Sequence, residues 1–263
     1  MISCTVGALL GQGKFGVVYE GTTKKDNKRV AIKMERSNCT YKVLRHEATV
    51  LNYLYRCGVA CIPKIYWFGQ HLGNTCLVMS YFSTSLHEYI LCKGTSSVVV
   101  KCLDILEHIH RHHILHRDLK PQNFMINDGD LYLIDFGLST VFMDDEGNHI
   151  HKADNHHIIG SPKYVSYYNH CGEPMGRRDD LLSLGYMFMY IENGTLPWDC
   201  ARGGETSICD PANIIRRDQK AWHKVSEYVD GPVRMYMKYC YELKYDDKPN
   251  YRILMELFTQ TFA

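Results

Sequence analysis

The spacing of apolar residues divides the chain into a strand-rich part and a helical part. Short apolar and β-branched segments that alternate as strands do occupy residues 6–11, 16–21, 29–35, 65–68 and 75–80. Between the third and fourth segments, apolar residues recur with a helical period over residues 41–56. We therefore expect a small sheet with one packed helix in the first eighty residues.

From residue 85 onward the apolar pattern becomes helical. Amphipathic or apolar stretches predict helices over residues 98–109, 180–192, 232–243 and 249–261. The Asn-Asp-Gly-Asp stretch at 127–130 predicts a turn between two short strands. The expected fold class is α+β, with two lobes.

The change of pattern also predicts where the lobes meet. We expect one domain over residues 1–263, with an N-lobe at 1–79, a hinge at 80–83 and a C-lobe at 84–263. The most apolar run, residues 181–191, is shorter than the roughly 20 residues that span a bilayer. It therefore predicts a buried core helix rather than a membrane anchor.

Composition excludes some functions and suggests a cellular compartment. The 263 residues are 45% hydrophobic and carry a net charge of +1, so no global field attracts nucleic acid or a membrane surface. The odd number of cysteines, 11, and the absence of a signal-peptide pattern favour reduced thiols. We expect a cytoplasmic and/or nuclear protein that is monomeric.

Three glycines, Gly11, Gly13 and Gly16, lie between two predicted strands. A plain hairpin turn would explain them equally well. The residues after Gly16 continue as a strand, which disfavours a dinucleotide-binding fingerprint, where a helix follows. The alternative is a loop over phosphates, because missing side chains let backbone N–H groups approach an anion.

A lysine and a glutamate form the second candidate pair. Lys33 ends the stretch Val-Ala-Ile-Lys on the third predicted strand, and Glu47 lies on the one helix of this part. An ion pair between them would hold Lys33 at the α- and β-phosphates of a nucleotide. The alternatives are an exposed lysine and a solvated glutamate.

The strongest motif is His-Arg-Asp-Leu-Lys-Pro-Gln-Asn at residues 116–123. Asp118 can accept or orient a substrate hydroxyl, Lys120 is spaced to reach a transferring phosphoryl group, and Asn123 can ligate a metal. Asp135 begins an Asp-Phe-Gly stretch after a predicted strand and is a second metal ligand. Positioned charge of this kind stabilises the transition state of phosphoryl transfer.

Together these motifs resemble the eukaryotic protein kinase family over nearly the whole chain, and Lys120 resembles its Ser/Thr branch. The resemblance implies a two-lobed kinase that uses ATP and Mg²⁺ on protein substrates. It also implies that Asp180 holds the catalytic-loop backbone. The residues that would surround the adenine and the phosphates are Leu10, Gly11, Gly13, Gly16, Val18, Ala31, Lys33, Met79 (the gatekeeper), Ser80, Tyr81, Phe82, Met125 and Ile134. Plain core packing explains Met125 and Ile134 equally well.

The Ala-Pro-Glu motif that usually closes the activation segment of a kinase is absent, and the residues in its place indicate a narrower resemblance. The stretches at 160–166, 177–186, 196–198 and 245–251 are similar to the casein kinase I family. The chain departs from that family at Lys163, where an Arg is usual, and over residues 199–211. The resemblance implies a substrate-anion site at Lys163.

Charge and modifiable residues suggest how substrates are selected. Neutral Gln122 stands where kinases that favour basic peptides carry a carboxylate, so we expect acidic or already phosphorylated substrates. The residues that would extend the positive surface are Arg177, Arg178, Arg216, Arg217 and Lys220. Solvated charge is the alternative for these residues.

The segment between Val141 and Gly160 contains no Ser, Thr or Tyr, so we expect activity without activating phosphorylation. Arg117 must then find another anion, with Asp144, Asp145 and Glu146 as candidates or a bound sulfate or phosphate.

Other interpretations remain beside this one. A pseudokinase would lack at least one of the six residues Lys33, Glu47, Asp118, Lys120, Asn123 and Asp135, and all are present. A small-molecule kinase usually lacks the Arg beside the catalytic aspartate. The histidines near residues 108–113 and 149–157 have no accompanying ligand pattern, so we expect solvated side chains rather than a metal site.

Overall fold

The computed structural model describes residues 4–13, 16–36, 42–90, 96–150, 156–201, 203 and 206–259. Contacts divide the chain into two compact units. The first unit comprises Met1–Ser85 and Phe124–Leu138, and the second comprises Leu86–Asn123 and Ser139–Ala263. The sequence had placed residues 124–138 in the C-lobe, whereas the structure groups them with the N-terminal unit.

The reason for this grouping is local pairing. Strand β8 (Phe124–Asn127) pairs with β6 (Thr84–Ser85) and with β9 (Asp130–Leu133), which forms a three-stranded sheet. The Leu133 amide donates to the Cys61 carbonyl at 3.0 Å. The 3₁₀ turn η2 (Phe136–Leu138) packs against helix α1 (Val43–Arg56).

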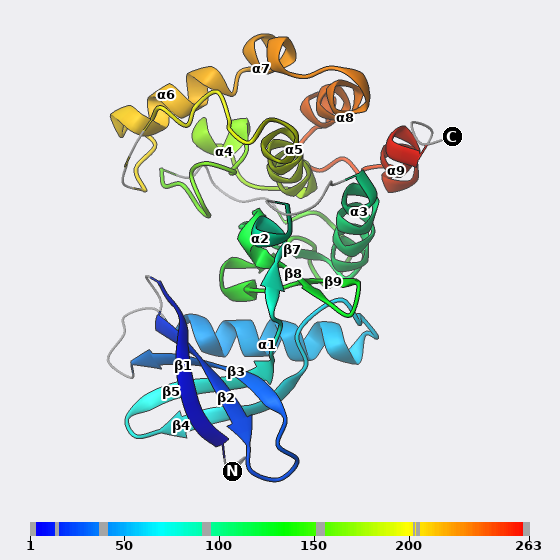
Figure 1. Cartoon of the computed structure of the whole chain (residues 1–263). Helices are drawn as coiled ribbons and strands as arrows, with labels where there is room; N and C mark the ends of the chain where they lie inside the picture. The colour runs from blue at the N-terminus through cyan, green and yellow to red at the C-terminus, as the bar shows by residue number, and fades with distance from the viewer. Residues whose placement is uncertain are drawn as a thin grey trace. The chain divides into compact units, whose positions relative to one another are not determined.

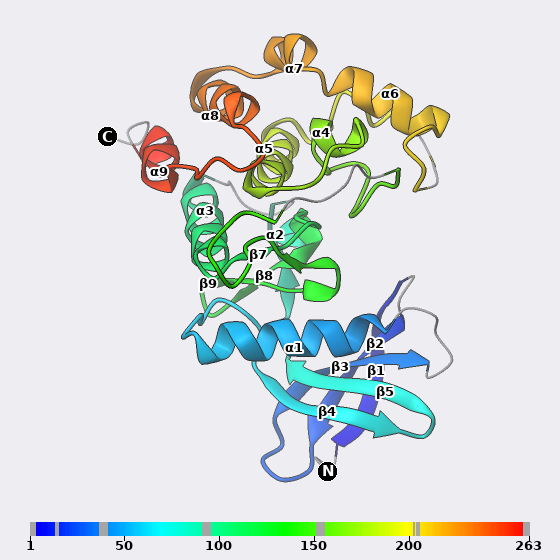
Figure 2. The same ribbon diagram turned by 180° about the vertical axis from the view of Figure 1, so that it is seen from behind.

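The first unit is built on an antiparallel five-stranded sheet in the order β1-β2-β3-β5-β4 (Figure 1). Helix α1 covers one face of this sheet in both ribbon views (Figures 1 and 2). Its buried side chains, Leu44, Leu51 and Leu54 among them, recur with the predicted helical period. The strands are β1 (Cys4–Gly13), β2 (Gly16–Thr23), β3 (Arg29–Arg36), β4 (Ile65–His71) and β5 (Asn74–Ser80).

The second unit packs around helix α5 (Arg177–Asn193). Every residue of α5 from Arg178 to Met189 is buried, which is typical of a helix that runs through a core. Its packing partners include α8 (Gly231–Glu242), while α9 (Tyr251–Thr259) contacts α3 (Ser96–Arg111) (Figure 2). These four helices confirm the predicted ones to within a few residues.

The remaining elements of the second unit are short, and the sequence pattern did not predict them. Helix α6 carries a clear start signal, because Asp210 accepts a hydrogen bond from the Ala212 amide and Pro211 is the first helical residue. These elements are α2 (Leu86–Ile90), β7 (Ile114–Leu115), η1 (Pro121–Asn123), β10 (Thr140–Val141), α4 (Tyr167–His170), α6 (Pro211–Gln219) and α7 (Trp222–Tyr228).

Within the described ranges, no helix combines the length and the apolar character needed to cross a membrane.

Candidate active site

The glycine-rich stretch lies where β1 and β2 meet. Gly13 pairs with Gly16 and Gly11 pairs with Val18, so the chain returns as a second strand and not as a helix. A Cβ on Gly16 would lie 2.2 Å from the Met34 carbonyl oxygen, whereas one on Gly11 or Gly13 would meet nothing within 4 Å. At Gly11 and Gly13, no side chain therefore covers the backbone, as a loop that binds phosphate requires. Residues 14 and 15 lie outside the described ranges.

Lys33 is held by two carboxylates of the same unit. Its Nζ lies 2.7 Å from Glu47 Oε1 and 3.0 Å from Asp135 Oδ1, which confirms the predicted Lys33–Glu47 pair. Glu47 is 1% exposed, whereas the Asp135 side chain is 44% exposed. Burial by itself would lower the pKa of Lys33, but Glu47 and Asp135 together raise it, so the side chain is an ammonium.

The residues predicted to surround adenine all lie in the first unit. Ala31 pairs with Met79 across β3 and β5, and both are buried. Phe82 stacks on Tyr132 with 4.6 Å between ring centroids. Met125 is on β8, Ile134 follows β9, and both are half-buried, while Leu10 on β1 is exposed.

One residue of the predicted hinge, Ser80, already uses its backbone N–H in a hydrogen bond within the protein. The Ser80 amide donates to the Lys64 carbonyl at 3.0 Å, and the Lys64 amide donates to the Ser80 hydroxyl at 3.1 Å. The Ser80 N–H is therefore part of the β4–β5 edge. Any adenine contact of this segment must use other backbone groups.

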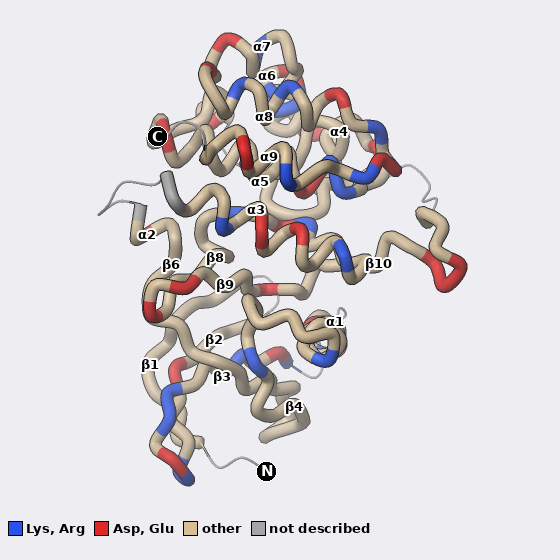
Figure 3. Tube along the Cα trace, turned by 90° about the vertical axis from the view of Figure 1, so that its right-hand side faces the viewer, with Lys and Arg blue, Asp and Glu red and all other residues tan. Residues whose placement is uncertain are grey.

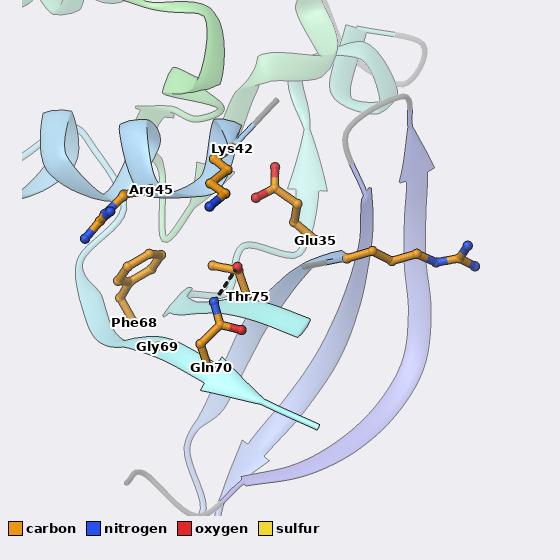
Figure 4. Close-up of a pocket in the computed structure, with 8 residues that line it drawn as sticks. Glu35, Lys42, Arg45, Phe68, Gly69, Gln70 and Thr75 are labelled. Carbon is orange, nitrogen blue, oxygen red and sulfur yellow. Dashed lines mark hydrogen bonds between the residues drawn. The ribbon is translucent and has the colours of Figure 1, made fainter. Parts of the chain in front are cut away.

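A separate pocket of about 400 Å³ lies near the beginning of α1 (Figure 4). Lys42 and Arg45 of the α1 region and Phe68 of β4 line it, and a hydrogen bond of 2.8 Å joins Gln70 to Thr75. Glu35 also lines it and accepts the Val43 amide at 2.9 Å, so it caps the start of the helix. None of the residues predicted to bind ATP lines this pocket.

In the second unit, Asp180 holds the catalytic-loop backbone, as the resemblance implied. Its carboxylate accepts the amides of His116 at 2.8 Å and Arg117 at 2.9 Å, and it lies 3.0 Å from His110 Nε2. Burial by itself would raise the pKa of Asp180, but these interactions lower it, so the carboxylate is charged. Arg117 has a φ of 68°, a conformation that a non-glycine residue keeps only where its surroundings hold it.

The Asp118 carboxylate is fixed from several directions. Oδ2 accepts from Lys120 Nζ at 2.7 Å and from Asn123 Nδ2 at 3.2 Å, while Oδ1 accepts the Ser161 amide at 2.8 Å. Asn123 Nδ2 also donates to the Asp118 carbonyl at 2.8 Å. Three predicted site residues, Asp118, Lys120 and Asn123, therefore form one hydrogen-bonded group.

Ser161 belongs to this group, although the sequence analysis gave it no such role. Its hydroxyl lies 3.0 Å from Lys120 Nζ. The approach depends on Gly160, which has a φ of 100° and whose Cβ would lie only 2.3 Å from the Arg117 carbonyl oxygen. The Gly-Ser pair before Pro162 was the sequence signal for this contact.

A buried lysine anchors the segment that follows Ser161. Lys220 is fully buried, and its Nζ donates to the Pro162 carbonyl at 2.9 Å and the Val165 carbonyl at 2.6 Å. Its third polar neighbour, His170 Nε2, lies 3.2 Å away. Burial lowers the pKa of Lys220 well below its ordinary value. Burial and the neighbouring Lys220 lower the pKa of His170 to about 2, which keeps the imidazole neutral.

The predicted extension of the positive surface is therefore wrong for three residues, because each is buried and satisfied internally. Lys220 holds carbonyl groups, Arg216 donates to Asn213 Oδ1 at 2.9 Å and to backbone carbonyls, and Arg178 pairs with Glu173. Arg177 is half-buried, and its Nη2 donates to the Asp246 carbonyl at 2.8 Å. Arg217 is exposed at 40% of its side chain and lies 3.4 Å from Asp218.

Lys163, the proposed substrate-anion residue, already has an anionic partner. Its Nζ lies 2.9 Å from Asp199 Oδ2 and 4.2 Å from the centre of the Tyr190 ring. The Lys163 side chain is 32% exposed, so it remains in contact with solvent. Asp199 comes from the stretch where the chain departs from the family pattern, which is why the sequence did not reveal this pair.

The expectation of solvated histidines is wrong for His110. His110 is 3% exposed and lies between Tyr251 and Asp180, with hydrogen-bonding contacts to both. It falls on the apolar stripe of α3, four residues after buried Leu106, which was the available signal. His156 is exposed, the His108 side chain is 45% exposed, and His151 lies outside the described residues. The described residues contain no group of three or more His, Cys, Asp or Glu side chains placed to hold a metal ion.

Comparison with known proteins supports the kinase motifs. The family model described as the protein kinase domain matches residues 4–257. Casein kinase I homolog 2 of Schizosaccharomyces pombe is 32% identical over 267 residues, an alignment that covers 96% of this chain and 61% of that protein. The chain thus spans about three fifths of the length of that relative. Both findings confirm the resemblance drawn from the motifs.

The neutral, buried His170 predicts a specific acid sensitivity. The native state does not take up a proton at His170 until the pH approaches 2, whereas an unfolded chain does so near the ordinary value of 6.5. As the pH falls below 6.5, this residue therefore removes about 1.4 kcal/mol of unfolding free energy per pH unit. Urea unfolding at several pH values should show a shallower pH dependence for His170→Gln than for the wild type. His223→Gln, which changes an exposed histidine, serves as control and should keep the wild-type slope.

Proposed function

The chain belongs to the protein kinase family, and on this premise we propose that it is a Ser/Thr kinase that transfers the γ-phosphate of ATP to proteins. The observation that carries the proposal is the Asp118 carboxylate held between Lys120, Asn123 and the Ser161 amide. Such a group presents a fixed anion to a substrate hydroxyl and a fixed cation beside it. Protein kinases use this combination in phosphoryl transfer.

In the first unit, Lys33 supplies positive charge for the ATP phosphates. Glu47 and Asp135 keep Lys33 protonated and fix its position, and the bare backbone at Gly11 and Gly13 supplies N–H groups to the same anion. A preorganised charge of this kind needs no rearrangement when negative charge shifts during transfer.

The residues present also suit Mg²⁺. Magnesium prefers oxygen ligands, and the Asp135 carboxylate is open to solvent while its Oδ1 pairs with Lys33. Asn123 uses its amide nitrogen to hold Asp118, which leaves its carbonyl oxygen as the ligand atom. When bound, the ion would neutralise charge on the phosphates.

In the second unit, Asp118 orients the acceptor hydroxyl and receives its proton. Two donors on Oδ2 and one on Oδ1 fix the plane of the carboxylate, so its remaining lone pairs point in defined directions. Lys120 already lies within hydrogen-bond distance of one serine hydroxyl, that of Ser161. The same ammonium would stabilise charge on the group in transfer.

We further propose that substrates are acidic or already phosphorylated. Partly exposed Lys163 supports this, together with neutral Gln122 in the catalytic loop. Asp199 competes with a substrate anion for Lys163. Of the five basic residues expected to extend the positive surface, three are buried, so the preference depends on few exposed charges. A partly exposed charge contact contributes up to about 1 kcal/mol, which corresponds to a preference of about fivefold.

We also propose that no phosphorylation of the activation segment is needed. Described contacts already hold the segment: the Phe142 amide donates to the His113 carbonyl at 3.0 Å, and the Tyr245 hydroxyl donates to the Ile150 carbonyl at 2.8 Å. Asp144, offered from the sequence as an anion for Arg117, instead accepts the amides of Glu146 and Asn148 in its own turn. The acidic run after β10 forms the red tip in Figure 3.

The catalytic roles predict two inactive but folded variants. Asp118→Asn and Lys33→Met should each lower kcat by about 10²–10⁴, because each removes a positioned charge from the reacting groups. Initial rates with radiolabelled ATP and a protein substrate give the comparison, and thermal unfolding shows that the variants are folded. Lys238→Ala, an exposed site on α8, is the control. Half of wild-type turnover in either catalytic variant would contradict the assigned roles.

The substrate preference predicts opposite effects for the two members of one ion pair. A peptide with phosphoserine or Asp three residues before the target Ser should be phosphorylated about two- to fivefold better, in kcat/KM, than the same peptide with Arg. Lys163→Ala should bring this ratio toward 1, and Asp199→Asn should increase it by releasing Lys163. An unchanged ratio in both variants would show that the pair does not select substrates, while leaving the kinase activity itself intact.

The activation proposal predicts indifference to phosphatase. Enzyme made in bacteria and treated with phosphatase should keep its initial rate to within about twofold, because phosphate-independent contacts hold the segment. Mock-treated enzyme is the control, and mass spectrometry establishes the phosphate content. A tenfold fall in rate would sink the proposal and direct attention to Ser139, Thr140 and Ser161.

A further inference from the structure

A second pocket, of about 390 Å³, lies in the second unit at the end of α3, the beginning of α5 and the segment that leads into α9. Figure 2 shows α9 beside α3 at this place. Pockets of this size hold small ligands or single side chains of a partner. None of the catalytic residues assigned above lines it.

Positive charge dominates this pocket. Four cationic side chains line it, against one carboxylate, Glu107. The cations are Arg111, Arg177, Lys248 and Arg252.

Two of the cations form ion pairs, and the other two form none among the described contacts, although the carboxylates of Asp246 and Asp247 act on the charge of Arg177. Arg111 pairs with Glu107 at 2.7 Å, and Arg252 pairs with Glu256 at 2.8 Å. Arg177 gives Nη2 to a carbonyl, but its buried Nε has no hydrogen-bond partner. Lys248 is exposed and forms no ion pair within the described ranges. A buried N–H without an acceptor destabilises the protein. An anion in the pocket that accepted a hydrogen bond from the Arg177 Nε would remove this cost.

The inner wall of the pocket connects to the catalytic loop. His110 and Tyr251 line the pocket and contact each other, and His110 Nε2 lies 3.0 Å from Asp180 Oδ2. Asp180 in turn accepts the amides of His116 and Arg117. Only the imidazole of His110 would therefore separate an anion in this pocket from the Asp180 carboxylate, which binds the backbone of the catalytic loop.

We propose that this pocket binds a phosphoryl group through Arg177, Lys248 and Arg252. A phosphate dianion balances the charge surplus better than a single carboxylate does. Its oxygens also match the fork of a guanidinium, which donates two parallel hydrogen bonds. The group is either free phosphate or the phosphorylated side chain of a protein segment, and both present the same chemistry.

The test is a titration of the protein, residues 1–263, with inorganic phosphate at pH 7.5 and constant ionic strength. Backbone amide NMR signals of Lys248, Asn250, Tyr251 and Arg252 report on this pocket, because all four residues line it. Constant ionic strength keeps general screening unchanged during the titration. We expect saturable shifts of these signals. A phosphoserine peptide in a second titration distinguishes the sources: tighter binding than phosphate indicates a protein segment, and equal binding indicates the free anion.

Matched variants make the result specific. Lys248→Ala/Arg252→Ala should weaken binding about fivefold or more, as expected for the loss of two partly exposed charge contacts. Lys101→Ala/Lys238→Ala removes the same net charge from exposed positions outside the pocket and should bind as the wild type does. Arg177→Lys keeps the charge but removes the unpaired Nε, and should also weaken binding.

Three results would overturn the proposal: no saturable shift, a shift that survives in Lys248→Ala/Arg252→Ala, or one that the control pair loses equally. Lys163→Ala and Asp118→Asn should leave the titration unchanged. The pocket and the proposed kinase activity can therefore fail independently.

Discussion

The second unit depends on one buried carboxylate, that of Asp180. A charge without access to water is tolerated only when hydrogen bonds replace its hydration, and Asp180 obtains them from the amides of His116 and Arg117 and from His110. The hydrogen bonds from the amides keep Arg117 at a φ of 68°, and this backbone bend determines the position of the next residue, Asp118. The same bend brings the Arg117 carbonyl close to Gly160, so that a residue without a side chain is required there.

The first unit solves a similar problem with the opposite charge. Lys33 is 14% exposed and needs anions beside it, and Glu47 from α1 and Asp135 from beyond β9 provide them. Because those carboxylates come from different elements, the ion pairs tie the helix and the β8–β9 hairpin to the sheet. Asp135 has a φ of 67°, so in both units a residue beside the chemistry is held in an uncommon backbone conformation.

The sequence predicted best what depends on local pattern or on chemistry at fixed spacing. The strands, the long helices and the Lys33–Glu47 pair followed from periodicity and motif. Contacts between distant segments that no motif marks were missed, because nothing in the local sequence near Lys220 shows that its Nζ would meet the Pro162 and Val165 carbonyls. Basic residues that looked solvated, such as Arg216, are buried for the same reason. Three short helices, α2, α4 and α7, are too brief to show a period.

Because Lys220 is buried, its reactivity measures how often the structure around it opens. Lys220 is 0% exposed, and its Nζ has three hydrogen-bonding contacts and lies 5.0 Å from the centres of the Tyr186 and Trp198 rings. An amine-acylating reagent reaches such a nitrogen only while the surrounding structure is open. When reclosing is fast, the acylation rate is the intrinsic rate multiplied by the fraction of open molecules. Exposed Lys238 supplies the intrinsic rate in the same molecule, so the ratio of the two acylation rates reads out how tightly the segment that carries Ser161 is closed.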